Sequence, residues 1–209
     1  MPVRTWAPLF GGALLASAWT GPLPALARDS FAAHMALHLL VVAVAAPLLA
    51  LAVLHRRGPH SRALRVLTPW PASLIELVVV WAWHLPRLHH AARTQWWAFA
   101  AEQGLFLAAG LLFWLSIVGA VASDRGRAVG TAVVALAATL AHMTLLGALL
   151  ALGPRPLYPH GGSAVEALAD QQRGGALMLV VSTVIYLGAG LLAARTVTGH
   201  ALSERTGTA

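Results

Sequence analysis

Long apolar runs separated by short polar segments dominate this sequence of 209 residues. Each run carries at most one carboxylate, and each is long enough for the roughly 20 residues that a membrane-spanning helix needs. The pattern predicts an all-α fold, a polytopic transmembrane helical bundle of about six spans. We place these spans within a single transmembrane domain, residues 1–209, at approximately 6–27, 31–54, 69–86, 96–121, 128–152 and 174–195.

The composition supports this interpretation and narrows the chemistry. Hydrophobic residues make up 58% of the chain and charged residues only 10%, against about 25% in a soluble domain. Mean hydropathy is +0.72, so we expect a lipid bilayer around the folded chain. The chain has no cysteine, which excludes structural disulfides, thiolate copper relays and cysteine-based zinc sites.

The first apolar run has two interpretations. Arg4, a short apolar core and the small residues of segment 25–27 form the pattern of a cleaved signal peptide. Three prolines also make this run the poorest helix former of the six. Cleavage would leave five spans, whereas a retained segment gives six, and both outcomes place Ser30 outside.

The arginines indicate the orientation in the membrane. Cytoplasmic loops are enriched in positive charge, and all 14 basic residues of this chain are arginines. With the amino terminus inside, nine of the 14 fall on the cytoplasmic side, and the other five are Arg28, Arg87, Arg93, Arg155 and Arg173. We therefore predict a multi-pass protein of a bacterial plasma membrane, with both termini cytoplasmic if the first span is retained. Because the arginines are spread over short loops, nucleic-acid binding is not expected.

Histidines and a carboxylate lie inside the predicted spans, where polar groups are costly and usually functional. His34 and His38 are four residues apart and share one helix face at the start of the second span. At about 1.5 Å per residue, His38 lies about 12 Å below the outer surface, Glu102 about 9 Å and His142 about 15–18 Å. His84 lies at the outer end of the third span. These five residues predict a metal site on the outer side of the membrane.

These imidazoles suit several transition metals, and two neighbouring methionines suggest copper without being diagnostic of it. Neutral imidazole binds copper, zinc, iron and nickel, and thioether sulfur adds a preference for Cu(I). Met35 and Met143 each directly follow a candidate histidine. Neighbouring residues on a helix diverge by about 100°, so a methionine and the histidine before it cannot both point into one site.

Each histidine also has a purely structural interpretation. An imidazole in a transmembrane bundle can simply hydrogen-bond a neighbouring helix, for about 0.6 kcal/mol on average. The histidines that we interpret as loop or cytoplasmic residues outside the site are His55, His60, His89, His90, His160 and His200.

Two other function classes remain open. Glu76 in the inner half of the third span would favour a copper or proton-coupled transporter, although a salt bridge to the arginine-rich segment 56–65 is the simpler interpretation. Histidines on two helices can also ligate haem iron, as in a membrane redox protein. Catalysis is not expected, because the sequence HMALH at 34–38 lacks the glutamate of HExxH, and no phosphate-binding glycine loop or serine elbow is present.

Four sequence blocks carry a resemblance to a known family. They are HMALHLLVVAVAAPLLAL from residue 34, WHLPRLHHAA at 83–92, EQGLFLAAGLLFW at 102–114, and HMTLLGALLALGPRPLYP from residue 142, followed by DQQRGGALM. In order and spacing they resemble the CtaG-type cytochrome c oxidase assembly factors, which are multispanning bacterial membrane proteins linked to copper insertion into haem-copper oxidases.

The resemblance implies a membrane-embedded assembly factor that binds copper on the extracytoplasmic side, aids its insertion and catalyses no reaction. Its partners would be a cytochrome c oxidase subunit or a copper chaperone. The positions that it carries over as site residues are His34, His38, His84 and His142. The chain departs from the family pattern after Glu102, where Gln103 stands in place of a common histidine. A second interpretation therefore stays open, in which the chain is a paralogue with an altered site or handles copper apart from the oxidase.

Reporter fusions test the orientation. Fusions after Arg65 and after Arg127 should report the cytoplasm, because the arginine distribution places both residues inside. Fusions after Arg93 and at Gly162 should report the outside. The measurement compares a reporter that is active only in the cytoplasm with one that is active only outside it. An outside signal after Arg65 would reverse the placement of every histidine.

Overall fold

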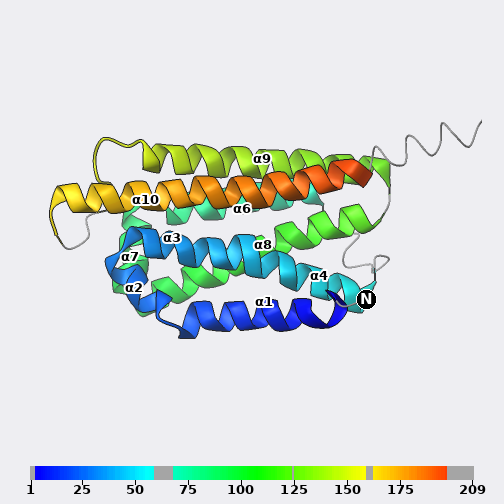
Figure 1. Cartoon of the computed structure of the whole chain (residues 1–209), viewed down its shortest axis with the longest axis horizontal. Coiled ribbons are helices and arrows are strands. Elements are labelled where there is room, and N and C mark those ends of the chain that lie inside the picture. The colour runs from blue at the N-terminus through cyan, green and yellow to red at the C-terminus, as the bar shows by residue number, and fades with distance from the viewer. Residues whose placement is uncertain (1–2, 59–67, 124, 159–161, 197–209) are drawn as a thin grey trace, which may run out of the picture.

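The computed structural model describes residues 3–58, 68–123, 125–158 and 162–196. Every regular element in these ranges is a helix, and the ranges contain no strand. The predicted all-α class is therefore confirmed. The long helices run side by side along an elongated bundle (Figure 1).

The helices comprise long segments and short pieces near one end of the bundle. In chain order they are α1 (Val3–Thr20), α2 (Leu23–Asp29), α3 (Phe31–Leu39), the π-helical segment η1 (Leu40–Ala45), α4 (Ala46–Arg57), α6 (Pro69–Trp83), α7 (Pro86–Thr94), α8 (Trp96–Ala122), α9 (Gly126–Ala151), α10 (Ala164–Ser182) and the π-helical segment η2 (Thr183–Leu187). The segments α3, η1 and α4 form one continuous helix, and the last helix continues through η2 to Thr196.

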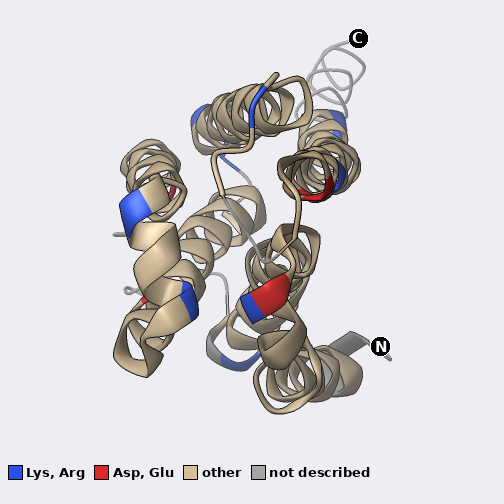
Figure 2. Cartoon of the chain, turned by 90° about the vertical axis from the view of Figure 1, so that its left-hand side faces the viewer, with Lys and Arg blue, Asp and Glu red and all other residues tan. Residues whose placement is uncertain are grey.

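Five helical segments surround the core. The continuous helix α3–η1–α4 packs against α8 and α10, while α6 packs against α8 and α9, and α9 packs against α10. These contacts close a ring, and α1 lies outside it, against η1 and α4 (Figure 1). The short helices α2 and α7 lie at one end of the bundle, which we call the α7 end and which faces the viewer in Figure 2.

Within the described ranges, four helices are long and apolar enough to cross a membrane: Phe31–Arg56, Trp96–Ala122, Gly126–Ala151 and Ala164–Thr196. The first segment is a fifth candidate only if α1 and α2 count as one span, because they meet at an angle of 48°. The third predicted span, 69–86, contains the apolar helix α6 of only 15 residues. Leu85 precedes a proline, takes an extended backbone and so prevents the helix from continuing.

The last helix begins earlier than the span predicted from residue 174. Ser163 and Glu166 form a capping box, in which the serine hydroxyl accepts from the Glu166 N–H and the glutamate accepts from the Ser163 N–H. This cap satisfies backbone donors that have no partner within the helix. It starts α10 at Ala164, so the first turns of the helix carry polar residues past the apolar run.

The π-helical segment η1 has a defined cause. Pro47 has no backbone N–H and cannot donate to a carbonyl of the preceding turn. The N–H of Ala46 donates to the Val41 carbonyl in the π-helical pattern. The Val42 carbonyl accepts instead from the indole Nε1–H of Trp114 at 3.0 Å. This bond satisfies a buried carbonyl and ties η1 to α8.

Apolar side chains cover the outside of the bundle as well as its core. On α9, α10 and η2, the side chains that are more than half exposed include Val134, Leu145, Leu149, Val180 and Val184. Such a surface is unusual in water but matches lipid tails. Charged residues lie on the short helices and helix termini at the α7 end, as Figure 2 shows. This distribution is that of a multi-pass membrane protein.

A polar cluster surrounds Glu76 of α6, farther from the α7 end. Glu76 is fully buried, and its carboxylate accepts from the Tyr186 hydroxyl at 3.0 Å and from the Thr139 hydroxyl at 3.5 Å. Hydroxyl groups are therefore the partners of Glu76 within the described residues, and the expected salt bridge to segment 56–65 stays a prediction. Arg56 forms no ion pair with it, and residues 59–67 lie outside the described part of the chain.

Helices α9 and α10 approach each other closely at two glycines. A Cβ atom built on Gly175 would lie 2.4 Å from the backbone nitrogen of Ala151 and 2.7 Å from the carbonyl oxygen of Gly147. These are backbone atoms, which cannot rotate away as a side chain can. Small residues at such crossings let helices pack in lipid, where no hydrophobic effect draws them together. The crossing therefore holds α10 against α9.

Replacing Gly175 by Ala should lower the stability of the folded protein, because overpacking a tight contact costs about 1–3 kcal/mol and occasionally more. Gly188, in the same continuous helix, has no atom within 4 Å of a built Cβ. Gly188→Ala is therefore the matched control and should change little. The measurement is the midpoint of thermal unfolding in detergent. Equal midpoints for both variants and the wild type would contradict the close approach.

Candidate metal centre

Two histidines and one carboxylate converge at the α7 end. His34 of α3, His89 of α7 and Glu102 of α8 are all buried, and one ligand atom of each lies within 4.8 Å of the others. His34 Nε2–H donates to Glu102 Oε1 at 3.1 Å. The rings of His34 and His89 meet edge to face, with centroids 4.5 Å apart. We call these three residues the triad.

His38 lies beside the triad, one turn farther along α3. Its ring centroid is 4.2 Å from that of His34, and its Nε2 is 3.5 Å from Glu102 Oε1. The amide of Gln103 donates to His38 Nδ1 at 3.4 Å and to Glu102 Oε2 at 3.3 Å. Because Nδ1 accepts, the proton of the neutral His38 ring is on Nε2 and faces the carboxylate. The indole of Trp19 donates to Gln103 Oε1 at 3.2 Å and orients the amide.

Asp170 of α10 holds the first turn of α3. Its carboxylate accepts from the Ser30 hydroxyl at 2.9 Å and from the Phe31 N–H at 2.5 Å. Ser30 is also the N-cap of α3, because its hydroxyl oxygen accepts from the Ala33 N–H. The N–H groups of a first turn have no partner within the helix, and a carboxylate there is favoured by the helix dipole. These bonds position His34, which follows in the next turn.

Gln171 and Tyr158 hold the loop that follows α9. The side-chain oxygen of Gln171 accepts from the Leu157 N–H at 2.6 Å, and its amide donates to the Leu150 carbonyl at 3.3 Å. The Tyr158 hydroxyl donates to the carbonyl oxygen of His84 at 2.6 Å. The DQQ sequence of α10 and this tyrosine therefore connect α3, the end of α9 and the end of α6.

The short helix α7 carries His89 to the triad. The guanidinium of Arg93 donates to the Arg28 carbonyl, from Nε at 2.7 Å, and ties α7 to α2. The His89 ring packs against Phe31 and Tyr158, with centroids 5.3 Å and 4.4 Å away. Burial lowers the pKa of the His89 imidazole far below its usual value, and the neighbouring imidazole acts in the same direction. The ring is therefore neutral and keeps a lone pair for a metal ion.

His84 lies next to His38, with ring centroids 6.0 Å apart. Its Nδ1–H donates to the Val80 carbonyl at 2.7 Å, and its Nε2 lies 3.3 Å from Met35 Sδ. The structure thus brings into one contiguous cluster four of the five residues that the sequence indicates as ligands, namely His34, His38, His84 and Glu102.

His142 does not join this cluster. Its side chain is buried on α9, and among the described residues neither ring nitrogen has a hydrogen-bond partner. The next residue, Met143, lines a pocket in the core, and side chains one residue apart on a helix diverge by about 100°. A ligand role for His142 stays a prediction. His60, His160 and His200 lie outside the described part of the chain.

Sequence reasoning missed two residues of the cluster, His89 and Gln103. It treats His89 as a loop residue, whereas its segment folds as α7, with His89 and Ala92 buried on one face. The available signals were Pro86 at the helix start and the three-residue spacing of that face. Gln103 follows Glu102 within an apolar span, where a second polar group is costly enough to indicate a role.

The donor set of the triad suits a first-row transition metal. Two imidazole nitrogens and one carboxylate oxygen are ligands for copper, zinc and iron. Ligands bonded to one ion at about 2.0–2.2 Å stand at most about 4.4 Å apart, so a small inward movement of the rings would complete a site. For His34 Nε2 to bind a metal ion, the proton on this atom would have to move to Nδ1 of the same ring. An open pocket of about 370 Å³, lined in part by His89, His90 and Arg93, reaches this region from the α7 end.

Comparison with known protein families agrees with the resemblance carried by the four sequence blocks. Residues 1–198 match the family described as cytochrome c oxidase caa3 assembly factor (Caa3_CtaG). No individual curated protein and no solved structure matches the chain. The matched range includes every helix described above and every residue of the cluster. The chain therefore belongs to the cytochrome c oxidase caa3 assembly factor family.

Proposed function

We propose that this membrane protein binds copper at its α7 end and helps to insert it into a cytochrome c oxidase, as a chaperone that catalyses no reaction of its own. Family membership supports the role in oxidase assembly. The observation that carries the metal-binding role is the convergence of His34, His89 and Glu102 from three helices, with His38 beside them.

The electrostatics of the triad favour a bound cation. Glu102 is fully buried, and its ion-pair partners among the described residues are His34 and His38, with no arginine. An isolated buried carboxylate costs several kcal/mol in desolvation. A metal ion would balance this charge and would use the imidazole lone pairs at the same time. Cu(I) with one carboxylate gives a neutral site, which is the least costly combination to bury.

Delivery requires that the ion can leave as well as bind. The triad supplies three ligands, and a metal with an open coordination position can accept a further ligand from a partner. His89 lines the open pocket at the α7 end, so it is the ligand that a partner would reach first. Stepwise replacement of these ligands by groups on an oxidase subunit or a soluble copper chaperone would transfer the ion without a redox step.

The arginine distribution supports an extracytoplasmic position for the α7 end. Arg28 at the end of α2 and Arg93 at the end of α7 belong to the minority of five arginines. The cytoplasmic side would carry the other nine. In this orientation the triad faces the compartment from which copper would arrive.

One observation favours a second function, copper or proton-coupled transport. The buried cluster of Glu76, Tyr186 and Thr139 places polar groups farther along the bundle, as a pathway across the membrane requires. The haem alternative gains no such support. The cavity beside His38 and His84 has a volume of about 10 Å³, far too small for a porphyrin.

Deleting the protein should lower oxidase activity when copper is limiting, because the metal would no longer be concentrated for insertion. Surplus copper should partly restore the activity by mass action on the empty oxidase site. The measurements are oxidase activity and the copper content of the purified oxidase at both copper levels. Normal copper content in the deletion strain at limiting copper would favour transport.

Substituting His89 and His90 in turn separates a ligand from its exposed neighbour on α7. His89→Ala should weaken copper binding by the purified protein at least about tenfold. Even substitutions of residues that only hydrogen-bond a metal ligand lower metal affinity about 10–100-fold. His90 is exposed, so His90→Ala should change the affinity little. Copper titration with a competing chelator measures both. Equal affinities for the two variants would remove His89 from the site.

A further inference from the structure

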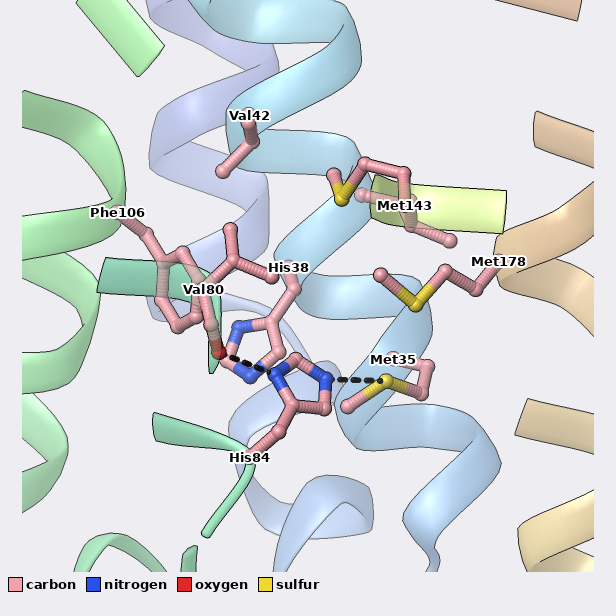
Figure 3. Close-up of a pocket in the computed structure, with 9 residues that line it drawn as sticks. Met35, His38, Val42, Val80, His84, Phe106, Met143 and Met178 are labelled. Carbon is pink, nitrogen blue, oxygen red and sulfur yellow. Dashed lines mark hydrogen bonds between the residues drawn. The ribbon is translucent and has the colours of Figure 1, made fainter. Parts of the chain in front are cut away.

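A small pocket lies on the axis of the helix ring, next to the triad. Its wall contains side chains from all five segments of the ring, on α3, η1, α6, α8, α9 and α10 (Figure 3). Its volume is about 10 Å³, which is the space of about one water-sized sphere. The pocket is therefore sized for a single ion.

Three methionines line this pocket: Met35 of α3, Met143 of α9 and Met178 of α10 (Figure 3). All three are at most 3% exposed. The chain has four methionines in all, and the fourth is the first residue. The helices therefore gather every internal thioether of the protein around one space, although the three lie on different helices. We call this space the thioether pocket.

His84 directs a lone pair into the thioether pocket. Its Nδ1–H donates to the Val80 carbonyl, which can only accept. In the neutral ring, Nε2 therefore carries a lone pair, and it faces Met35 Sδ, an atom without a proton to donate, at 3.3 Å (Figure 3). A proton on Nε2 would bury a full positive charge in a largely apolar pocket, which is costly. A metal ion would satisfy both donors and share its charge between them.

The distance between these two donors fits one ion. With metal–nitrogen and metal–sulfur bonds of about 2.0 and 2.3 Å, as at zinc sites, a separation of 3.3 Å corresponds to an angle of about 100° at the metal. This is close to the tetrahedral angle. Met143 and Met178 also line the pocket, and their flexible side chains, each with three rotatable bonds, can supply the remaining ligands after a change of rotamer (Figure 3).

We propose that the thioether pocket is a Cu(I) site, with the sulfurs of Met35, Met143 and Met178 and the Nε2 of His84 as its ligands. Thioethers are soft, uncharged donors that select Cu(I). Among the residues that the structure describes, no carboxylate lines the pocket, so a monovalent ion is less costly to bury there than a divalent one. This proposal rests on the proposed function only in taking copper as the cargo. The preference for a soft metal ion follows from the thioether ligands themselves.

The thioether pocket and the triad are two positions joined by His38. This histidine lines the pocket, and its Nε2 is also 3.5 Å from Glu102 Oε1. Copper entering as Cu(I) past His89 would pass from nitrogen and oxygen ligands to sulfur ligands by exchange through His38. The oxidation state is unchanged along this path, so no electron donor is needed. The triad is the position of exchange with the outside, and the thioether pocket is the position of retention.

A packing role for the methionines makes a different prediction. Methionine also fills irregular gaps in cores, and its replacement by leucine nearly conserves volume. Packing alone therefore predicts that Met143→Leu with Met178→Leu leaves metal binding unchanged. Ligation predicts a loss of Cu(I) affinity with little loss of stability, which the unfolding midpoint of the same variant measures.

The test uses the full chain purified in detergent, without oxygen and with a reductant. Competition with a coloured Cu(I) chelator gives the Cu(I) affinity, and X-ray absorption at the copper edge shows whether sulfur is bound. Removing two ligands with Met143→Leu and Met178→Leu should weaken Cu(I) binding at least about 100-fold and reduce the sulfur signal. Substituting a residue that only orients a metal ligand already lowers metal affinity about 10–100-fold. Co(II), a divalent probe of the triad, should bind this double variant as it binds the wild type.

A Glu102→Gln variant separates the two positions. It should lose Co(II) while its bound Cu(I) keeps sulfur ligands. An unchanged Cu(I) affinity in the double methionine variant, or a wild-type spectrum without sulfur, would overturn the thioether site and leave the proposed function standing. A wild-type protein that binds neither Cu(I) nor Co(II) would overturn both proposals.

Discussion

The buried carboxylate of Glu102 is the constraint around which the α7 end is built. A carboxylate in the core of a membrane protein must be paired or hydrogen-bonded, since its desolvation costs several kcal/mol. Here two imidazoles and the Gln103 amide surround it, and these groups come from α3 and α8. The positions of His34 and His38, and therefore the geometry of any metal site, follow from the need to satisfy this one group.

The polar residues of the DQQ sequence support the cluster without entering it. Asp170 holds the start of α3, while Gln171 holds the loop that bears Tyr158. That tyrosine in turn donates to the backbone of His84. Ligands are oriented by the groups behind them, so such a shell restricts how far each imidazole can move. The close crossing of α9 and α10 at Gly147 and Gly175 adds the rigidity that the shell requires.

Helix geometry separates the donors into two chemical kinds. His34 and Met35 are adjacent, and their side chains diverge by about 100°, so one reaches the carboxylate and the other the thioether pocket. The sequence HM occurs again at 142–143, where only the methionine faces this pocket. The nitrogen and oxygen donors of the triad thereby lie nearest the open end, and the three thioethers line the pocket next to it. If the two proposed sites bind copper, this change from harder to softer donors would favour inward movement of Cu(I).

The sequence by itself determined the all-α membrane class, because apolar runs of spanning length have few other stable structures in lipid. It also indicated His34, His38, His84 and Glu102, since polar groups in such runs are costly. Only the tertiary structure brought His89 into the triad and gathered three methionines, because their proximity depends on how separate helices pack. The same packing left His142 outside the cluster and gave Glu76 hydroxyl partners. The spacing of residues along the sequence specifies which of them share a helix face. Which other helix packs against that face depends on the fold of the whole bundle.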